Sequence, residues 1–385
     1  MKKLLAKMDI PLLILTIVFS LFGLMMIYSA SSVSAVIRYN RPSYFFFLKE
    51  LLALVIAYTI SFLFIIKFPT KYYNKIVWPL LGIIIFLLTF LFVKGKIINK
   101  VTSWYRFGFF GFQPSEFAKS ALILFCACYY DKLSKSKVKG ILAYLVPLII
   151  AFILMALIMM QPDLGSAAIV IGIFFMIFIS IPMLKSNVFK IIKIVGIGSI
   201  VGMVCLAYSG QEILNSMQLN RFKFKNPCSR YTEESGYQVC NGFIAMNNGG
   251  LFGVGLGKST QKYLYLPESH TDFIFPIIVE ELGLITGIIV IIGYIYMLYR
   301  ILRIARNSEN LRCSIIAYGT FWYLLLHIVI NLLGILALIP LTGVPLPFLS
   351  YGGSFAINVI FMLFLVQRVN IENNINKANR EIRAL

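Results

Sequence analysis

Runs of about 20 mostly apolar residues recur along nearly the whole chain, and they constrain its fold more than any other feature. Each run is long enough for a helix to cross about 30 Å of hydrocarbon. Helices are required there because unpaired backbone groups are costly in lipid. With 59% hydrophobic residues and a mean hydropathy of +0.86, the composition lies far outside that of soluble domains. The sequence therefore predicts an all-α polytopic membrane protein.

We predict one integral membrane domain over residues 1–385, with about ten transmembrane helices. The apolar runs lie near residues 10–30, 44–66, 76–93, 114–131, 141–160, 164–184, 190–209, 272–299, 313–339 and 352–369. Residues 210–270, rich in Gly, Asn, Lys and Arg, separate the seventh and eighth runs. This segment is too short for a comfortable core of its own, so we expect one large extracellular loop.

The formal net charge of +20 is distributed unevenly. Lys and Arg gather in alternate segments: the N-terminus, the short loops around 67–75, 132–139, 185–193 and 300–312, and the C-terminus. This positive-inside pattern predicts a multi-pass protein of the bacterial cytoplasmic (inner) membrane with both termini in the cytoplasm. The charge thus reflects membrane orientation, and we expect no nucleic acid partner.

Two of the six cysteines, Cys228 and Cys240, fall in the large outer loop. That position is oxidising in many bacteria, so a disulfide between them is one alternative and two free thiols the other. The cysteine spacing does not resemble a zinc site.

Acidic residues are scarce, and several lie in or against the predicted spans on the outer side. A charge at a helix centre costs about 2.5–3.5 kcal/mol, so such residues usually face a polar interior and carry a function. Glu116 and Lys119, three residues apart on one helix face, form either a self-neutralising structural pair or a pair whose lysine points into a substrate groove. Asp163 either caps the next helix or contacts a substrate or metal.

The stretch "YLPESHTDFIFPIIVEELGL" (residues 265–284) holds the strongest candidate site. Thr271 is expected to cap a helix with Asp272 in its first turn, and Pro276 to distort that helix. Glu280 would lie about 12 Å deeper, behind Asp272. A partly desolvated carboxylate at the membrane mouth suits a general base or a ligand of a divalent cation. The alternative is a helix cap with a buried ion pair.

The two histidines and the outer cations complete the set of candidates. His270 is close enough in sequence to tune Asp272, whereas His327, alone in an apolar span, is expected to be a hydrogen-bonded core residue. Neither has a Ser or Cys partner for a hydrolytic triad. Arg106 and Lys258 lie on the face where topology does not need positive charge. They favour an anionic head group there, with solvated loop charge as the alternative.

Seven motifs occur in an order that resembles the shape, elongation, division and sporulation (SEDS) family, which includes FtsW, RodA and SpoVE. They are "YSAS", "QPSEFAK", "QPDLGSA", "GYQ", "GGLFGVGLGKSTQKYLYLPESHTDFIF", "EELG" and "GVPLPFLSYGGS". The resemblance covers nearly the whole chain, and "QKY" before "YLPESHTDF" looks more like the FtsW and SpoVE branch than the RodA branch.

This resemblance implies a glycosyltransferase that polymerises the peptidoglycan precursor lipid II outside the cytoplasmic membrane during cell division. The implied partners are a class B penicillin-binding protein and other divisome proteins. The family's essential acid falls on Asp272, and its "QPSE..K" acid and lysine fall on Glu116 and Lys119. We also expect Ser350, in "GVPLPFLSYGGS", to contact substrate, and a divalent cation, Mg²⁺ or Mn²⁺, to act with Asp272.

Two departures from the family pattern affect these expectations. Ser103 stands where an Arg commonly precedes the Trp, which leaves a pyrophosphate contact to Arg106. Leu264 stands where some FtsW members carry an acid, which weakens a metal site built with Asp272.

Three alternatives remain. A RodA-like elongation polymerase would use the same chemistry. A lipid II flippase or transporter would place ionisable residues near the middle of the membrane and show inverted repeats, which we do not find in the sequence. A non-catalytic divisome scaffold would leave Asp272 replaceable.

Overall fold

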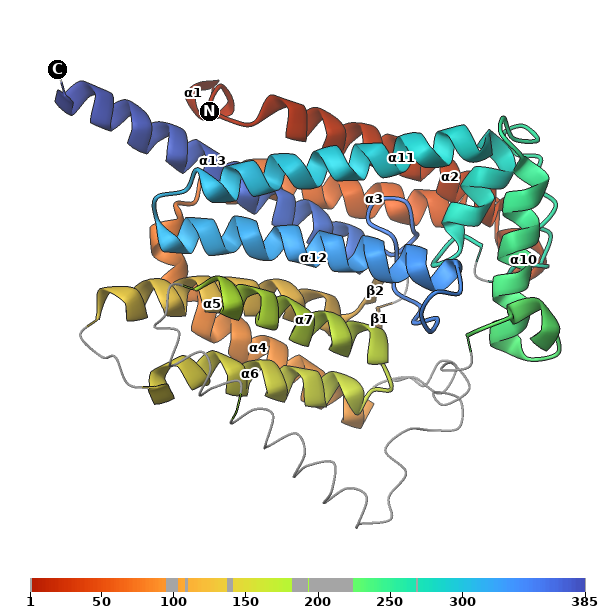
Figure 1. The fold of residues 1–385 in the computed structure, drawn as a ribbon, viewed down its shortest axis with the longest axis horizontal. Coiled ribbons are helices and arrows are strands. Elements are labelled where there is room, and N and C mark those ends of the chain that lie inside the picture. The colour runs from red at the N-terminus through yellow and green to blue at the C-terminus, as the bar shows by residue number, and fades with distance from the viewer. Residues whose placement is uncertain are drawn as a thin grey trace, which may run out of the picture.

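The computed structural model describes residues 2–94, 103–107, 110–136, 141–181, 193, 224–267 and 269–384. Within these ranges the chain forms a bundle of long helices, with both termini at one end and α10 across the other (Figure 1). The helices are α1 (Lys2–Leu5), α2 (Ile10–Ile37), α3 (Phe45–Ile60), α4 (Tyr73–Lys94), α5 (Pro114–Lys135), α6 (Ile141–Met159), α7 (Leu164–Ser180), α10 (Glu234–Gly249), α11 (Ile274–Arg306), α12 (Leu311–Ile335) and α13 (Gly353–Ala384). Short helical turns η1 (Ser61–Ile65), η2 (Thr70–Tyr72) and η3 (Pro227–Arg230) accompany them.

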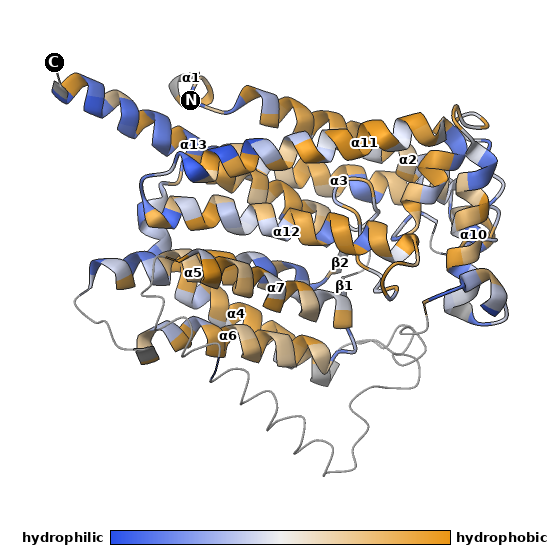
Figure 2. Cartoon of the chain, viewed as in Figure 1, coloured by the Kyte–Doolittle hydropathy of each residue, from blue (hydrophilic) through white to orange (hydrophobic). Residues whose placement is uncertain are grey.

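The all-α, polytopic character predicted from the apolar runs is confirmed. Among the described residues, seven helices are long and apolar enough to cross a membrane, and α7 is a shorter apolar helix. Apolar residues run along the bundle, while hydrophilic residues gather at its two ends (Figure 2). Apart from residue 193, the predicted span near 190–209 lies outside the described residues, as does the first part of the predicted outer loop.

The structure differs from the sequence-based prediction at several element ends. α13 continues past residue 369 to Ala384, where its turns become hydrophilic (Figure 2). The predicted loop contains the helix α10, and the segment before α5 contains a hairpin of β1 (Tyr105–Phe107) and β2 (Phe110–Phe112). Polar helices and short strands carry no long apolar run, so the criterion used for spans does not find them.

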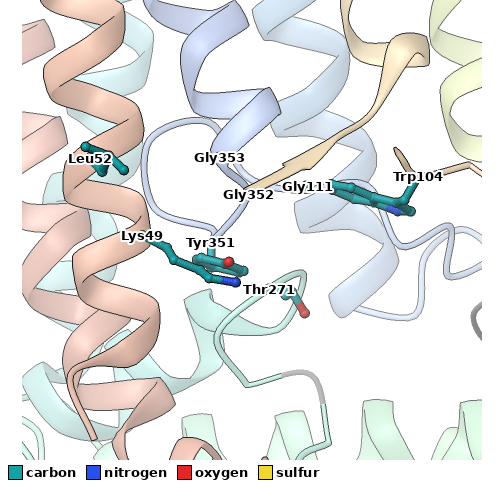
Figure 3. A pocket seen from close by; sticks show the side chains of 8 residues that line it. All are labelled: Lys49, Leu52, Trp104, Gly111, Thr271, Tyr351, Gly352 and Gly353. Atoms are coloured by element: carbon teal, nitrogen blue, oxygen red, sulfur yellow. The ribbon is translucent and has the colours of Figure 1, made fainter. Parts of the chain in front are cut away.

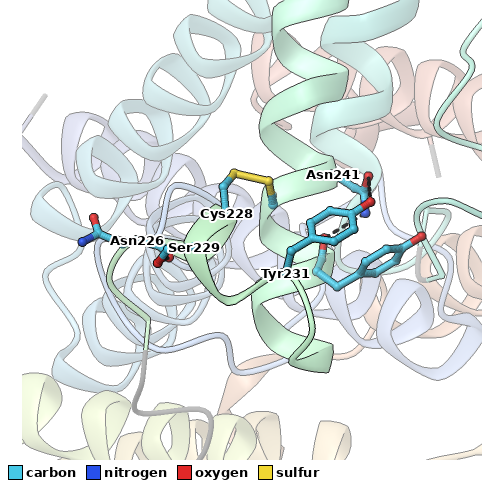
Figure 4. Close-up of a disulfide and its surroundings, with 7 residues drawn as sticks. Asn226, Cys228, Ser229, Tyr231 and Asn241 are labelled. Atoms are coloured by element: carbon cyan, nitrogen blue, oxygen red, sulfur yellow. Dashed lines mark hydrogen bonds between the residues drawn. A yellow bond between two sulfur atoms is a disulfide. The ribbon is translucent and has the colours of Figure 1, made fainter.

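A disulfide fixes the start of α10. Cys228 in η3 is bonded to Cys240 in α10, so the chain before α10 is attached to the helix itself (Figure 4). The Tyr231 hydroxyl adds a hydrogen bond to Asn241 Oδ1 at 3.4 Å. Of the two alternatives for these cysteines, the structure contains the disulfide.

The helix α11 is broken at Gly283, not at Pro276 as expected. Gly283 has φ 85° and ψ 166°, which separates a short first segment from the long helix that follows. Pro276 is the third residue of α11, a position whose N–H has no partner within the helix. Proline is therefore tolerated there without distortion.

The segment between α10 and residue 255 fills this break. Carbonyl and N–H groups freed from a helix must find partners inside the protein when water is absent. Four backbone hydrogen bonds supply them: Val254 N to Glu280 O, Gly255 N to Glu281 O, Leu284 N to Gly250 O and Ile285 N to Leu251 O.

Close approach of the two backbones explains the glycine-rich sequence "NNGGLFGVGLG". A Cβ added to Gly253 would lie 2.3 Å from the Glu281 carbonyl oxygen, and one on Gly283 would lie 2.2 Å from that of Leu251. Both residues also have positive φ, which glycine adopts at little cost. The glycines therefore allow the loop to pair with the broken helix and fix the segment that leads to Asp272.

Candidate functional site

An open pocket lies between α3, the β-hairpin, the turn before α11 and the start of α13 (Figure 3). Its cavity volume is about 140 Å³. The lining residues combine one cation, aromatic rings and small residues: Lys49, Leu52, Trp104, Gly111, Thr271, Tyr351, Gly352 and Gly353. A lysine beside aromatic surface and accessible backbone suits an anionic, sugar-bearing ligand.

Asp272 lies next to this pocket, half-buried in the turn before α11. The Thr271 hydroxyl, which lines the pocket, donates to Asp272 Oδ1 at 3.0 Å. The expected helix cap is wrong: α11 begins at Ile274 with Phe273 at the N-cap position and no side-chain cap. Thr271 instead orients the carboxylate, and Asp272 stands outside the helix on an irregular turn.

The loop between α12 and α13 supports this turn. The Tyr351 N–H donates to the His270 carbonyl at 2.8 Å. Ser350 is buried, and its hydroxyl oxygen accepts from the Leu346 N–H at 2.8 Å. The structure thus gives Ser350 a role in holding the loop, and its expected contact with substrate remains a prediction.

Lys49 and Glu50 on α3 were missed in the sequence analysis. Glu50 is buried, and its Oε2 accepts from the Gly352 N–H at 3.1 Å, so it holds a residue that lines the pocket. Two adjacent charged residues inside the apolar run "FFFLKELLALV" are the same signal that singled out the other acids. Applying that criterion to the second span would have found them.

The Glu116–Lys119 pair forms as one of the two alternatives describes. Lys119 Nζ lies 2.7 Å from Glu116 Oε1, and both side chains are buried. The structure does not show the other alternative, a lysine that points into a substrate groove. Lys119 is fully buried and its Nζ lies 3.2 Å from His327 Nε2, so packing of α5 against α12 closes it off. His327 is accordingly a hydrogen-bonded core residue.

Asp163 caps α7, as one reading of the sequence expects. Its Oδ1 accepts from the Ser166 N–H at 3.0 Å, and its Oδ2 from Gln113 Nε2 at 3.3 Å. Gln113 directly precedes α5, so this carboxylate joins the starts of two helices. A contact of Asp163 with substrate stays a prediction.

Glu280 does not lie behind Asp272 in one continuous helix, because Asp272 precedes the helix. The Glu280 carboxylate is fully buried and accepts from Ser259 and from both the N–H and hydroxyl of Thr260, the latter at 2.9 Å. It anchors the loop segment before the Asp272 turn. A direct contact with substrate remains an expectation.

His270 is packed among aromatic rings. Its ring centroid lies 4.6 Å from that of Phe46 and 5.7 Å from that of Tyr351. Burial, with a smaller contribution from Arg38, lowers the pKa of His270 to about 4, so it is neutral at physiological pH. It can help to place Asp272 through its backbone but adds no positive charge there.

The remaining candidates are less constrained. Lys258 is exposed, and the side chain of Arg106 lies outside the described residues. Ser103, which replaces the common Arg, is buried and donates to the Gln161 carbonyl at 3.3 Å. Leu264, where the family pattern led us to expect an acid in some members, is exposed with φ 69°.

The fold and this arrangement define a multi-pass helical membrane protein with one acid beside a pocket and a buried acid–lysine pair. Residues 10–375 match the FtsW, RodA and SpoVE family model, described as cell cycle protein. The chain belongs to this family, as the motifs suggested.

Two relatives from Bacillus subtilis (strain 168) illustrate the match. One, named probable peptidoglycan glycosyltransferase FtsW, is 36% identical over 392 residues, covering 99% of this chain and 95% of the relative. The other, stage V sporulation protein E, is 36% identical over 352 residues, covering 90% of this chain and 92% of the relative.

Solved structures share the fold at lower identity. A chain from a peptidoglycan synthase complex has a TM-score of 0.73 at 22% identity, with 95% of this chain and 98% of that chain covered. The rod shape determining protein RodA of Thermus thermophilus has a TM-score of 0.66 at 24% identity, with 94% and 96% covered.

Proposed function

We propose that this chain is a peptidoglycan glycosyltransferase that polymerises lipid II into glycan strands at the outer face of the cytoplasmic membrane, in cell division. The FtsW name of its relatives supports this activity. The observation that carries the proposal is the carboxylate of Asp272, oriented by Thr271 beside a pocket that contains Lys49. An acid and a cation at one pocket suit transfer of a sugar from a pyrophosphate.

In this proposal Asp272 is the general base. It removes the proton from a sugar hydroxyl of the incoming lipid II, and that oxygen attacks the anomeric carbon of the growing glycan. The bond from that carbon to the pyrophosphate breaks, and undecaprenyl pyrophosphate leaves with the electron pair. Lys119 is too deeply buried to meet the leaving group. Lys49 and the exposed Lys258 are the cations that would stabilise its charge.

A divalent cation, Mg²⁺ or Mn²⁺, remains part of the proposal. Among the described residues no group of three or more His, Cys, Asp or Glu could hold a metal. Mg²⁺ commonly uses one or two carboxylates together with substrate phosphates, so Asp272 and the lipid pyrophosphate form a chemically suitable set. When bound there, the cation would neutralise charge on the pyrophosphate.

A class B penicillin-binding protein and other divisome proteins are the proposed partners. The similar fold of a chain from a peptidoglycan synthase complex supports assembly with such a partner. Both termini would be cytoplasmic, in keeping with the alternate basic segments. Both termini lie at the end of the bundle opposite α10, which supports their placement on one side of the membrane (Figure 1).

The activity is tested by incubating the purified protein with labelled lipid II and either Mg²⁺ or Mn²⁺. The assay is run with and without the co-expressed partner. A ladder of long glycans on a gel supports the polymerase. A chelator should abolish the ladder if the cation takes part. No polymer with the partner demonstrably bound, together with movement of lipid II across vesicle membranes, would assign transport instead.

A further inference from the structure

We infer that His327 and Asn331 are positioning residues that hold the Asp272 turn in its active geometry and connect it to the buried Glu116–Lys119 pair. This inference rests on the proposed role of Asp272. His327 and Asn331 are four residues apart on α12, so they lie on one face of the helix. Both are buried.

Asn331 joins the Asp272 turn to the loop that follows α12. Its Nδ2 donates to the backbone carbonyl of Asp272 at 2.9 Å and to that of Val344 at 2.8 Å. An amide NH₂ has two hydrogens, and each is used. Asp272 lies two residues before the first residue of α11, and this bridge holds its backbone carbonyl.

His327 holds the next carbonyl of the same loop. Its Nδ1 lies 3.3 Å from the Pro345 carbonyl oxygen, and its Nε2 lies 3.2 Å from Lys119 Nζ. A lysine ammonium donates and does not accept, while a carbonyl only accepts. His327 must therefore accept at Nε2 and donate at Nδ1, so the two contacts assign a single neutral tautomer.

The loop residue before these two carbonyls faces the acid. A Cβ added to Gly343 would lie 3.6 Å from Asp272 Oδ2, and Gly343 has φ 70°. Gly343 thus faces the Asp272 carboxylate, and the next two loop residues, Val344 and Pro345, contact Asn331 and His327 through their carbonyl oxygens. A shift of His327 or Asn331 would move the loop against the carboxylate, so the buried Glu116–Lys119 pair acts on the site through His327 without touching substrate.

The test uses four variants and measures kcat and KM for lipid II polymerisation in the complex with the partner. Asn331→Ala removes both donated bonds and keeps the helix. His327→Phe keeps a ring between Tyr323 and Phe355 but removes both nitrogens, whereas His327→Gln has an acceptor and a donor. Thr320→Val, on the same helix, removes only a bond to the Ile316 carbonyl and is the matched control.

We expect kcat to fall about 100-fold in Asn331→Ala and His327→Phe with little change in KM, because a displacement near 1 Å costs roughly that much. His327→Gln should recover most of the rate, and Thr320→Val should match the parent protein. Thermal unfolding of each complex confirms that it is folded. If His327→Phe does not fold, the kcat values of Asn331→Ala and His327→Gln test the positioning role.

Folded Asn331→Ala with the parent kcat would overturn the inference, as would a loss confined to KM or a His327→Gln variant no better than His327→Phe. Asp272→Asn, assayed in parallel, separates the two claims. If Asp272→Asn polymerises normally, the proposed function of Asp272 fails; if it is inactive while Asn331→Ala is normal, only the positioning role fails.

Discussion

Lys262 and Glu281 form an ion pair buried between the segment that follows α10 and the broken helix α11. Lys262 Nζ lies 2.9 Å from Glu281 Oε1, and the two side chains are 3% and 0% exposed. Nζ also donates to the Gly257 carbonyl and to Ser29 Oγ of α2, at 2.6 and 3.3 Å. This pair attaches the loop before Asp272 to two membrane helices.

Lys262→Met should destabilise the protein by about 3–5 kcal/mol, because it leaves the Glu281 charge buried without its cation. The measurement is thermal unfolding in detergent. Lys258→Met, an exposed lysine of the same segment, is the control and should have almost no effect. Equal unfolding temperatures for the two variants would show that the buried pair does not hold the loop.

Gly283→Ala should destabilise the protein by about 2–5 kcal/mol, because the residue needs positive φ and the new Cβ would meet the Leu251 carbonyl at 2.2 Å. Gly257→Ala separates the two causes. Gly257 has φ 78° with open space around it, so its cost is the conformational strain alone, about 1–2 kcal/mol. Similar losses in both variants would contradict the close approach of the loop to the broken helix.

Breaking the Cys228–Cys240 disulfide should lower the free energy of unfolding by about 3 kcal/mol, since the bond restricts the unfolded chain. The double variant Cys228→Ser, Cys240→Ser and the reduced parent protein should unfold at similar, lower temperatures. Reductant should have no further effect on the double variant. If reductant leaves the unfolding temperature of the parent protein unchanged, the disulfide does not stabilise the fold.

His270 should make the fold sensitive to acid. Its pKa is about 4 in the folded protein and about 6.5 when unfolded, so the unfolded state binds the extra proton first as pH falls. The stability contributed by the neutral ring is complete above pH 6.5 and is lost as pH drops toward 4, on the order of 3 kcal/mol. His270→Gln should unfold with a shallower pH dependence over that window; an unchanged slope would count against a buried neutral histidine.

The sequence predicted the membrane helices well because apolar runs of sufficient length have few alternatives in lipid. It predicted the geometry around Asp272 poorly. Helical periodicity places Asp272 and Glu280 on one helix, but that reasoning cannot show where a helix begins. The interruption at Gly283 depends on backbone hydrogen bonds from residues 250–255, a tertiary interaction that no local pattern contains.

For the candidate site too, the sequence predicted which residues matter better than it predicted their geometry. Scarcity of charge pointed to Asp272, Glu116 and Lys119, and the structure gives each a defined set of contacts. Burial decided what Lys119 can do, because its charge alone suited a substrate ligand as well as a core ion pair. The sequence contains no signal for the bridging role of Asn331. A single asparagine in an apolar span is equally compatible with a side-chain hydrogen bond to its own helix.

Polymerisation of lipid II by Asp272→Asn is the most direct test of the central claim, that this carboxylate is the catalytic base. Asn keeps the shape and the oxygen that accepts from Thr271 but cannot take up the proton. Glu233→Gln, which changes an acid that pairs with Arg230 and does not line the pocket, is the control. The account predicts no glycan ladder from Asp272→Asn and a normal ladder from Glu233→Gln, with both proteins folded and bound to the partner. A normal ladder from Asp272→Asn would contradict it.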